Sequence, residues 1–329
     1  MKYYLAPLEG ITNFIYRNAY AEVFNDIDKY YAPFVVPNES RSLKTKEFFD
    51  ILPENNEGIN LIPQILTNDA HGFIMTAYKM KKLGYNEINL NLGCPSSTVV
   101  SKNRGSGFLA FPDELDKFLY EIFDKTARIE GVTKISIKTR IGKESSDEFY
   151  KLLEIYNKYP LEELIIHPRT QKDFYGNKPH IDMFKYAESH SRNPLCYNGD
   201  IFTADNFKHI DKKINCDNAA EINTYMLGRG IIANPGLIYE IKNNSTAPKK
   251  KIKEFHDKVL ENHLEKYNNE RNILFKMKEI WCYMMDLYKY MEGIEKTAKK
   301  IRKAEKLSTY KETVDELFKE RCYGEEKEY

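Results

Sequence analysis

The sequence lacks the cysteine spacings that build a disulfide framework or a zinc site. It has five cysteines, an odd number, and no two of them are separated by CxxC or zinc-finger spacing. We therefore expect free thiols, no bound metal and a reducing compartment. The cysteines are Cys94, Cys196, Cys216, Cys282 and Cys322.

Long apolar runs are also missing. No stretch of 18 apolar residues occurs, and Met1–Pro7 has none of the hydrophobic character of a signal peptide. We therefore expect no membrane partner and a cytoplasmic location.

The chain has almost no net charge, with a formal value of +1 over 329 residues. Overall charge therefore does not mark it as a nucleic-acid binder. The distribution is uneven, because residues 241–329 hold 21 Lys and Arg against 17 Asp and Glu, a net of +4. The small basic excess lies at the C-terminal end.

No GxGxxG follows the first expected strand, which disfavours a nucleotide-binding open sheet. Short apolar segments instead alternate with helical patterns such as Asp69–Leu83, Asp113–Thr126 and Asp147–Lys158, the first with Asn68 as its expected N-cap. This alternation predicts a (β/α)8 TIM barrel, an α/β fold, with an open doubly wound sheet as the alternative. The expected strands are 3–6, 31–36, 61–66, 86–91, 133–138, 162–167, 194–198 and 222–227.

The composition changes after Ile238. Residues 243–251 have the composition of a linker, and from residue 252 onward there is no proline. Ile273, Met277, Ile280, Met284 and Leu287 recur there at helical spacing, which predicts a buried stripe. We expect a barrel domain at 1–242, a linker at 243–251 and a small C-terminal α-helical domain at 252–329. The neighbouring Phe275, Trp281, Tyr283 and Met285 are also expected in its core.

Polar residues stand at the carboxyl end of nearly every expected strand. Any single one could be structural, but function in a barrel gathers at these ends, so their convergence predicts a site. Cys94, in Asn89–Pro95, is either an inert small hydrophobe or an acid or nucleophile. The other strand-end residues are Glu9, Gln64, Asn91, Lys138, Arg140, His167, Arg169, Asn198 and Arg229.

Two glycine-containing loops follow the seventh and eighth expected strands, Asn198-Gly199-Asp200 and Gly228-Arg229-Gly230. They are either tight turns or a phosphate site, which barrels often place there. Lys138 is either paired with a carboxylate or available to stabilise an anionic cofactor.

With these residues in place, the chain resembles the tRNA-dihydrouridine synthases, flavoproteins with a barrel and a C-terminal helical domain. The resemblance spans most of residues 1–240. It is carried by APLEGITN (6–13), NLNLGCPSSTV (89–99), ISIKTRIG (135–142), LIIHPRTQKDFYG (164–176), YNGDIF (197–202) and MLGRGIIANP (226–235).

The resemblance implies an FMN cofactor and assigns a role to each matching residue. Cys94 would be the general acid, Gln64 and Lys138 would hydrogen-bond the flavin edge, and Asn91 and His167 would lie close to it. NADPH or NADH would reduce FMN, the flavin would give hydride to C6 of a uridine, and Cys94 would protonate C5. Pro7, Leu8 and Glu9 would lie along the isoalloxazine, and Asn198, Gly199, Asp200, Gly228 and Arg229 would hold the phosphate.

The same resemblance implies tRNA as the partner, and we expect a monomer. We assign substrate or RNA contact to Arg140, Arg169, Lys299 and Lys303; the last two belong to the densest basic run, whose other reading is a solvated helix. Thr98 stands where the family usually has Lys, which removes a charge beside Cys94. The alternatives are a flavin barrel acting on a small molecule and an RNA-binding homologue without catalysis.

Overall fold

The structure is a computed structural model that describes residues 1–37, 45–127, 134–216 and 221–319. The described residues form two compact units, each assembled from separate stretches of sequence. The first contains Met1–Glu9, Asp28–Gly199 and Ile210–Met226. The second contains Gly10–Ile27, Asp200–His209 and the described residues from Leu227 onward. Cys322 and the end of the expected helical domain lie outside the described residues.

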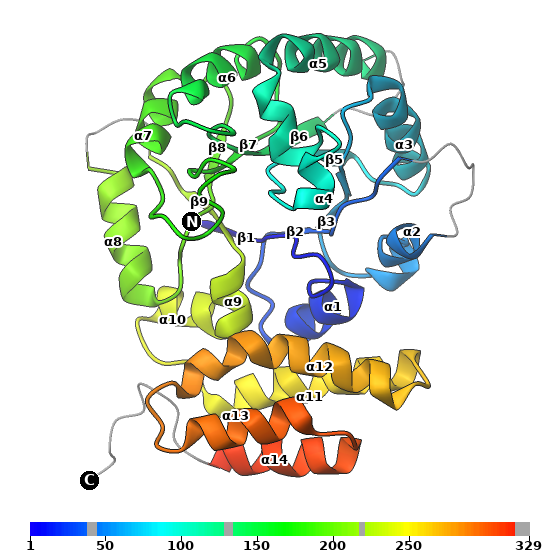
Figure 1. Ribbon diagram of the computed structural model, residues 1–329, viewed down its shortest axis with the longest axis vertical. Coiled ribbons are helices and arrows are strands. Elements are labelled where there is room, and N and C mark those ends of the chain that lie inside the picture. The colour runs from blue at the N-terminus through cyan, green and yellow to red at the C-terminus, as the bar shows by residue number, and fades with distance from the viewer. Residues whose placement is uncertain (38–44, 128–133, 217–220, 320–329) are drawn as a thin grey trace. The chain divides into compact units, whose positions relative to one another are not determined.

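The first unit is built on a parallel, nearly closed, TIM-barrel-like sheet (Figure 1). Its strands follow the order β3-β2-β1-β9-β8-β7-β6-β5-β4, and neighbouring strands among the described residues pair in parallel. The predicted barrel is confirmed at this level. The strands are β1 (Lys2–Leu5), β2 (Lys29–Tyr31), β3 (Leu61–Ile62), β4 (Gln64–Ile65), β5 (Glu87–Leu92), β6 (Lys134–Arg140), β7 (Leu164–His167), β8 (Leu195–Tyr197) and β9 (Thr224–Leu227).

Pro63 explains why the third expected strand is divided into β3 and β4. Proline has no N–H to donate to a ladder, so regular pairing stops at this residue. Its carbonyl still accepts from Asn89 N at 2.9 Å. Because β3 pairs with β2 and β4 pairs with β5, this single stretch of chain joins the two ends of the sheet.

Two details differ from the sequence expectations. The second strand ends at Tyr31 and not at residue 36, because Pro33 interrupts it and only Val35 returns to bridge Ile65. The N-cap of α3 (Ala70–Lys82) is Asp69, whose side chain accepts from the N–H groups of residues 71 and 72, and not Asn68. Asn68 donates to the Lys102 carbonyl instead.

Helices α3, α5, α6 and α7 lie around the outside of the strands (Figure 1). They cover the apolar outer face of the sheet, as parallel strands require. The helical segments between β2 and the second glycine loop are α2 (Lys46–Asp50), η1 (Pro53–Asn55), α3, α4 (Ser97–Val100), η2 (Gly105–Ala110), α5 (Pro112–Thr126), α6 (Glu148–Tyr156), α7 (Ile181–His190) and α8 (Ala204–Ile214).

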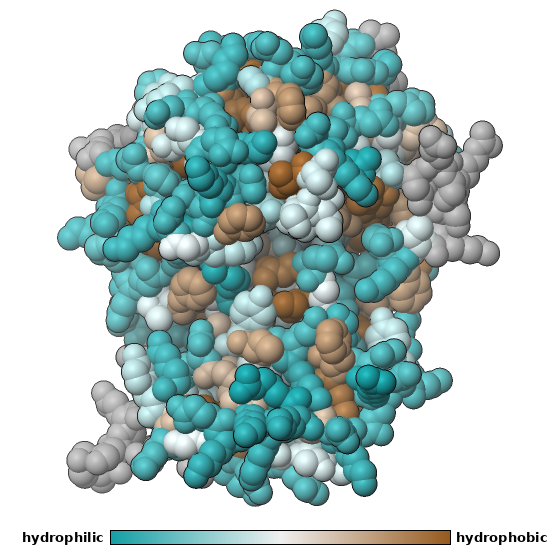
Figure 2. Space-filling model, in the orientation of Figure 1, coloured by the Kyte–Doolittle hydropathy of each residue, from teal (hydrophilic) through white to brown (hydrophobic). Residues whose placement is uncertain are grey.

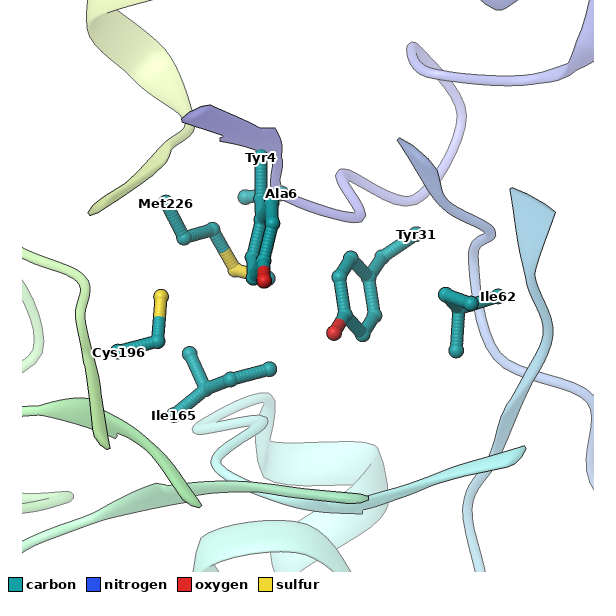
Figure 3. Packing of buried hydrophobic residues seen from close by; sticks show 7 residues of the cluster. All are labelled: Tyr4, Ala6, Tyr31, Ile62, Ile165, Cys196 and Met226. Carbon is teal, nitrogen blue, oxygen red and sulfur yellow. The ribbon is translucent and has the colours of Figure 1, made fainter. Parts of the chain in front are cut away.

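The centre of the barrel is filled by side chains from different strands (Figure 3). Tyr4, Tyr31, Ile165 and Cys196 are each at most 2% exposed. Cys196 is therefore a packed core residue, which is the ordinary role of a buried free cysteine.

One carboxylate is buried beside this cluster. Glu163 accepts hydrogen bonds from the hydroxyls of Tyr4 (3.1 Å) and Tyr31 (3.4 Å) and is 6% exposed. Burial raises the pKa of Glu163 to about 7, although the charge of Lys29 opposes the shift. Because the folded state holds this proton more tightly than the unfolded chain, the stability that it contributes is lost as the pH rises from about 4.5 to 7.

We therefore expect Glu163→Gln to stabilise the protein, relative to wild type, more at pH 8 than at pH 5. The gain should be on the order of 3 kcal/mol at pH 8, because Gln carries no charge that must be buried and can still accept from a tyrosine hydroxyl. Urea unfolding at both pH values measures it. The control is Glu121→Gln, an exposed residue of a surface ion pair, which should change stability by less than about 1 kcal/mol at either pH. An equal effect of Glu163→Gln at pH 5 and pH 8 would contradict the prediction.

The second unit is helical. Tyr16, Tyr20 and Phe24, at the N-terminal part of the chain, pack their rings against Phe255, with centroids 5.1 to 6.1 Å apart. This aromatic contact joins residues 14–24 to the C-terminal helices. The helices are α1 (Phe14–Val23), α9 (Arg229–Ala233), α10 (Leu237–Asn243), α11 (Lys249–Lys266), α12 (Glu270–Met284), η3 (Met285–Tyr288), α13 (Ile294–Lys303) and α14 (Leu307–Lys319).

The predicted apolar stripe lies on α12. Ile273, Met277, Ile280 and Met284 are all buried, at 4% exposure or less. Phe275 is 60% exposed, so its expected place in the core is wrong: it falls on the opposite side of a helix whose stripe is set by the 3.6-residue period. Residues 249–251 of the expected linker form the first turn of α11, and the domain boundaries stay a prediction.

A polar chain crosses this helical core. Trp281 Nε1 donates to the Tyr310 hydroxyl at 2.7 Å, and that hydroxyl lies 2.8 Å from His256 Nε2. His256 Nδ1 lies 2.9 Å from Asp257, so the imidazole donates to the carboxylate and accepts from the tyrosine. Tyr310 therefore satisfies two buried groups at once.

We expect Tyr310→Phe to destabilise the protein by about 1–3 kcal/mol, because it leaves Trp281 Nε1 and His256 Nε2 buried without this partner. Trp281 is the one tryptophan of the chain, so its fluorescence follows urea unfolding of this unit. Tyr120→Phe removes a hydroxyl from a residue that is 67% exposed and should stay within about 0.5 kcal/mol of wild type. Equal midpoints for the two variants would show that the polar chain contributes nothing.

Candidate active site

An unusual run of amides lines one face of β4, β5 and β6. Gln64 Nε2 donates to Asn89 Oδ1 (2.7 Å), and Asn89 Nδ2 donates to Ser136 Oγ (2.9 Å). Asn91 Nδ2 donates to Gln64 Oε1 at 2.7 Å. A barrel interior usually carries branched apolar residues, and buried amides are tolerated only when paired. These four side chains satisfy one another.

The strand register brings the predicted polar residues to one end of the barrel. Asn91 is paired with Lys138 across β5 and β6, and Arg140 is paired with His167 across β6 and β7. Carboxyl ends of parallel strands meet at one edge, which is where barrel enzymes place their chemistry. Gln64, Asn91, Lys138 and His167 therefore lie on four successive strands at the same end.

The peptide segment Gly93–Cys94 is held at each of its main-chain polar groups. Asn91 Oδ1 accepts from both Gly93 N and Cys94 N at 3.0 Å. Arg140 Nε donates to Gly93 O at 3.0 Å, and Ser106 Oγ donates to Cys94 O at 2.9 Å. A Cβ at Gly105 (φ +56°) would lie 2.8 Å from Cys94 O, so only glycine permits this approach.

The Cys94 side chain is half-buried and remains a thiol. Burial raises its pKa above the ordinary value, and Glu9 adds to this, while the Ser96 N–H and the charges of Arg140 and Lys138 oppose it. A raised pKa keeps the sulfur protonated at neutral pH, which suits a proton donor and does not suit a nucleophilic thiolate.

Lys138 is a half-buried cation. Among the described residues no carboxylate lies within ion-pair distance of it, which argues against the paired structural role. Burial, with the neighbouring charge of Arg140, lowers the pKa of Lys138 to about 8. An uncompensated ammonium at the mouth of a barrel favours an anionic or acceptor-rich ligand.

Arg140 and Arg169 are buried, at 1% and 2% exposure. Arg140 Nη1 donates to the carbonyls of Thr170 (2.8 Å) and Phe174 (3.0 Å), and Arg169 Nε donates to Asn177 O. Both guanidinium groups are thus engaged with main-chain carbonyls. Their assignment to substrate or RNA contact stays a prediction.

Arg169 also determines the tautomer of His167. Its Nη1 lies 3.2 Å from His167 Nε2. Because a guanidinium only donates, Nε2 must be the acceptor, so the ring carries its proton on Nδ1.

The loop after β1 approaches the same place. Leu8 packs against the barrel core, Pro7 is half-buried, and Glu9 is exposed and close enough to influence Cys94. Asn198 Nδ2 donates to Met226 O at 2.8 Å. A Cβ at Gly199 would lie 2.6 Å from the Tyr197 hydroxyl, so a larger residue there would have to displace the tyrosine side chain.

The remaining phosphate candidates lie in the second unit. Arg229 donates to Asp200 at 2.8 Å and its guanidinium lies 5.3 Å from the ring of Phe202. Gly228 precedes the short helix α9. These residues are orientated by one another, and phosphate binding here stays a prediction.

Helix α13 of the second unit presents a basic face. Lys299 and Lys303 are exposed, and Ile294 and Ile301 face the core. Among the described residues neither lysine forms an ion pair, whereas Lys253 and Lys258 of α11 each have two carboxylate partners. The surface over α13 is largely hydrophilic (Figure 2).

Two further observations concern the described residues alone. They contain no group of three or more His, Cys, Asp or Glu side chains arranged to hold a metal ion. None of their helices has both the length and the apolar character needed to cross a bilayer.

Comparison with known proteins assigns the chain. The sequence profile of the family described as dihydrouridine synthase (Dus) matches residues 4–323, nearly the whole chain. The chain belongs to the dihydrouridine synthase family. Similar proteins include the tRNA-dihydrouridine(16) synthase of Vibrio vulnificus, 27% identical, with 75% of this chain and 76% of that protein covered. A probable tRNA-dihydrouridine synthase of Staphylococcus aureus is 27% identical over 70% of this chain and 68% of its own.

The fold agrees with this family assignment. A crystal structure described as TcOYE with pHBA superposes with a TM-score of 0.55, covering 79% of this chain and 94% of that chain. At 11% identity this likeness concerns the fold alone.

Sequence reasoning missed two residues of this candidate site. Ser106 holds the Cys94 carbonyl, and Tyr175 lies with its ring 5.4 Å from the Arg140 guanidinium and 6.0 Å from His167. Tyr175 is half exposed beside Phe174, which has a positive φ of 47°. The stretch HPRTQKDFYG contains both aromatics, but only the fold turns them back over Arg140.

Proposed function

We propose that this protein is a tRNA-dihydrouridine synthase, an FMN-dependent oxidoreductase that reduces the 5,6 double bond of uridines in tRNA. The observation that carries the proposal is the placement of Cys94 at the carboxyl end of the barrel, where Asn91, Ser106 and Arg140 hold the main chain that carries its thiol. The family assignment and the names of the similar proteins support the same activity.

The residues present fit an isoalloxazine. Its pyrimidine edge alternates acceptors and a donor, and Gln64, Asn91, Lys138 and His167 offer amides, a cation and an imidazole N–H at one end of the barrel. Lys138 has no carboxylate partner among the described residues, so its charge is available to a bound anion. Pro7 and Leu8 supply apolar contact, with Glu9 beside them. Asn198, Gly199, Asp200, Gly228 and Arg229 are proposed to hold the phosphate.

Reduced by NADPH or NADH, FMN would supply the hydride that adds to carbon 6 of the uracil ring. The thiol of Cys94 donates a proton to carbon 5, which completes the loss of the double bond. Asn91 and Ser106 hold the main chain of Cys94, so the sulfur keeps one position. Lys138 holds positive charge at the reacting edge.

The tRNA must be held while one uridine leaves its stack. We propose that the exposed lysines of α13 contact the RNA backbone, because phosphates dominate the affinity of such complexes. Within the part of the chain that the structure describes, Lys299 and Lys303 have no ion-pair partner, which distinguishes them from the paired lysines of α11. Cytoplasmic location and a monomeric state stay predictions.

The purified protein should be yellow and release FMN on denaturation. Cys94→Ala should keep the flavin and its reduction by NADPH but lower dihydrouridine formation about 100-fold or more, because the proton donor is lost. Mass spectrometry of tRNA digests measures the product. Cys282→Ala removes an exposed thiol from α12 and should retain full activity.

Each other outcome has a distinct meaning. Colourless protein that takes up no FMN would overturn the enzymatic proposal and favour an RNA-binding homologue. A bound flavin that reduces a small enone but never uridine in tRNA would favour the small-molecule reductase. Undiminished dihydrouridine with Cys94→Ala would remove Cys94 from the reaction.

The double variant Lys299→Glu with Lys303→Glu should weaken tRNA binding and flatten its dependence on salt, because two phosphate contacts are lost and replaced by repulsion. Filter binding at several KCl concentrations gives the slope. The control is Lys212→Glu with Lys213→Glu on α8, which makes the same charge change at exposed positions. An equal loss of affinity in both double variants would mean that α13 contributes only overall charge.

A further inference from the structure

Arg140 is the residue on which the loops around Cys94 meet. Its Nε donates to Gly93 O in the loop after β5, and its Nη1 donates to Thr170 O and Phe174 O in the loop after β7. The side chain is 1% exposed and stands at the end of β6, the strand between them. One guanidinium thus joins three segments that are far apart in sequence.

We infer that Arg140 is a positioning residue: it fixes the Gly93–Cys94 peptide and thereby the placement of the Cys94 thiol, and it brings a positive charge close to that thiol. The positioning of the thiol by Arg140 does not depend on the proposed function. Only the role of that thiol as a proton donor rests on the proposed function. The positioning role of Arg140 differs from the RNA contact that the family resemblance suggested for this residue.

The geometry needs an arginine. The bonds to Gly93 O (3.0 Å) and Thr170 O (2.8 Å) leave from different nitrogens of a planar fork, so they fix both distance and direction. A lysine ammonium is one point on a flexible stem and cannot reach both loops in this arrangement. Nor could a side chain buried to this degree meet RNA without leaving its carbonyls.

Of the side chains that hold the main chain of Gly93 and Cys94, only Arg140 is charged. Asn91 and Ser106 hold the other main-chain groups of Gly93 and Cys94 with neutral amide and hydroxyl groups. Lys138 is the second cation that acts on the thiol, and it makes no hydrogen bond to this peptide among the described residues. Arg140 therefore both positions the Cys94 thiol and supplies positive charge close to it. Substitutions of Arg140 can separate these two effects.

The test is the pH profile of Cys94 alkylation by iodoacetamide, followed by peptide mass spectrometry on the full-length protein without substrate. The high-pH plateau reports access to the sulfur, and the midpoint reports its electrostatic surroundings. Arg140→Lys keeps a charge and loses the fork, so the plateau rate should rise several-fold with little movement of the midpoint. Arg140→Gln should raise the plateau and also move the midpoint to higher pH.

Arg140→Lys leaves a buried ammonium without all the carbonyl partners of the arginine, which can destabilise the fold. Arg140→Gln has no such ammonium and therefore keeps the test informative. The matched control is Arg169→Lys, since Arg169 is a second buried arginine that donates to Asn177 O and to His167. It should leave the Cys94 profile unchanged. Profiles of both Arg140 variants that superimpose on wild type would overturn the inference.

Turnover gives the second readout. For a positioning role, Arg140→Lys should lower kcat about tenfold or more with flavin content retained and KM for tRNA little changed. A raised KM at unchanged kcat would instead make Arg140 an RNA contact and overturn the inference. If the thiol profile changes as expected but wild type forms no dihydrouridine, the proposed function fails and the positioning role stands.

Discussion

The amide of Asn91 is the interaction on which the site depends. Its oxygen accepts from two consecutive N–H groups, at Gly93 and Cys94, and its nitrogen donates to Gln64. The amide can do this only because Gln64 is in turn fixed by Asn89. A polar network of this kind is costly unless every member is paired, and when paired it specifies one arrangement. At β4–β6 the barrel interior therefore contains paired amides in place of apolar side chains, and these amides support the main chain of Cys94.

The alternation Asn89-Leu90-Asn91-Leu92 made this strand predictable from sequence, because polar residues at every second position must share one face. Strand ends could likewise be predicted, and with them Lys138 and His167. What the sequence could not reveal is which carbonyls the arginines bind. Arg140 and Gly93 are 47 residues apart, and their contact exists only because β5 and β6 are neighbours in a particular register.

Two features of the fold depend on contacts that are distant in the sequence. Asn68 and Asp69 are both good N-caps, and the choice between them depends on tertiary contacts, since Asn68 is drawn to Lys102. A linear reading also assigns residues 10–27 to the barrel by position. The aromatic packing of Tyr16 and Tyr20 on Phe255 instead makes them part of the second compact unit. Long-range packing of this kind leaves no signal in periodicity.

In the role that we propose for it, Cys94 must meet two requirements of a proton donor that oppose each other. Before transfer the sulfur must keep its proton, and burial achieves this by raising the pKa of the thiol. After transfer the same sulfur is an anion, which burial alone would destabilise strongly. Arg140 and Lys138 lie close enough to lower the cost of that thiolate without abolishing the raised pKa. A buried thiol without these cations would hold its proton too firmly, and an exposed thiol beside them would lose it too early.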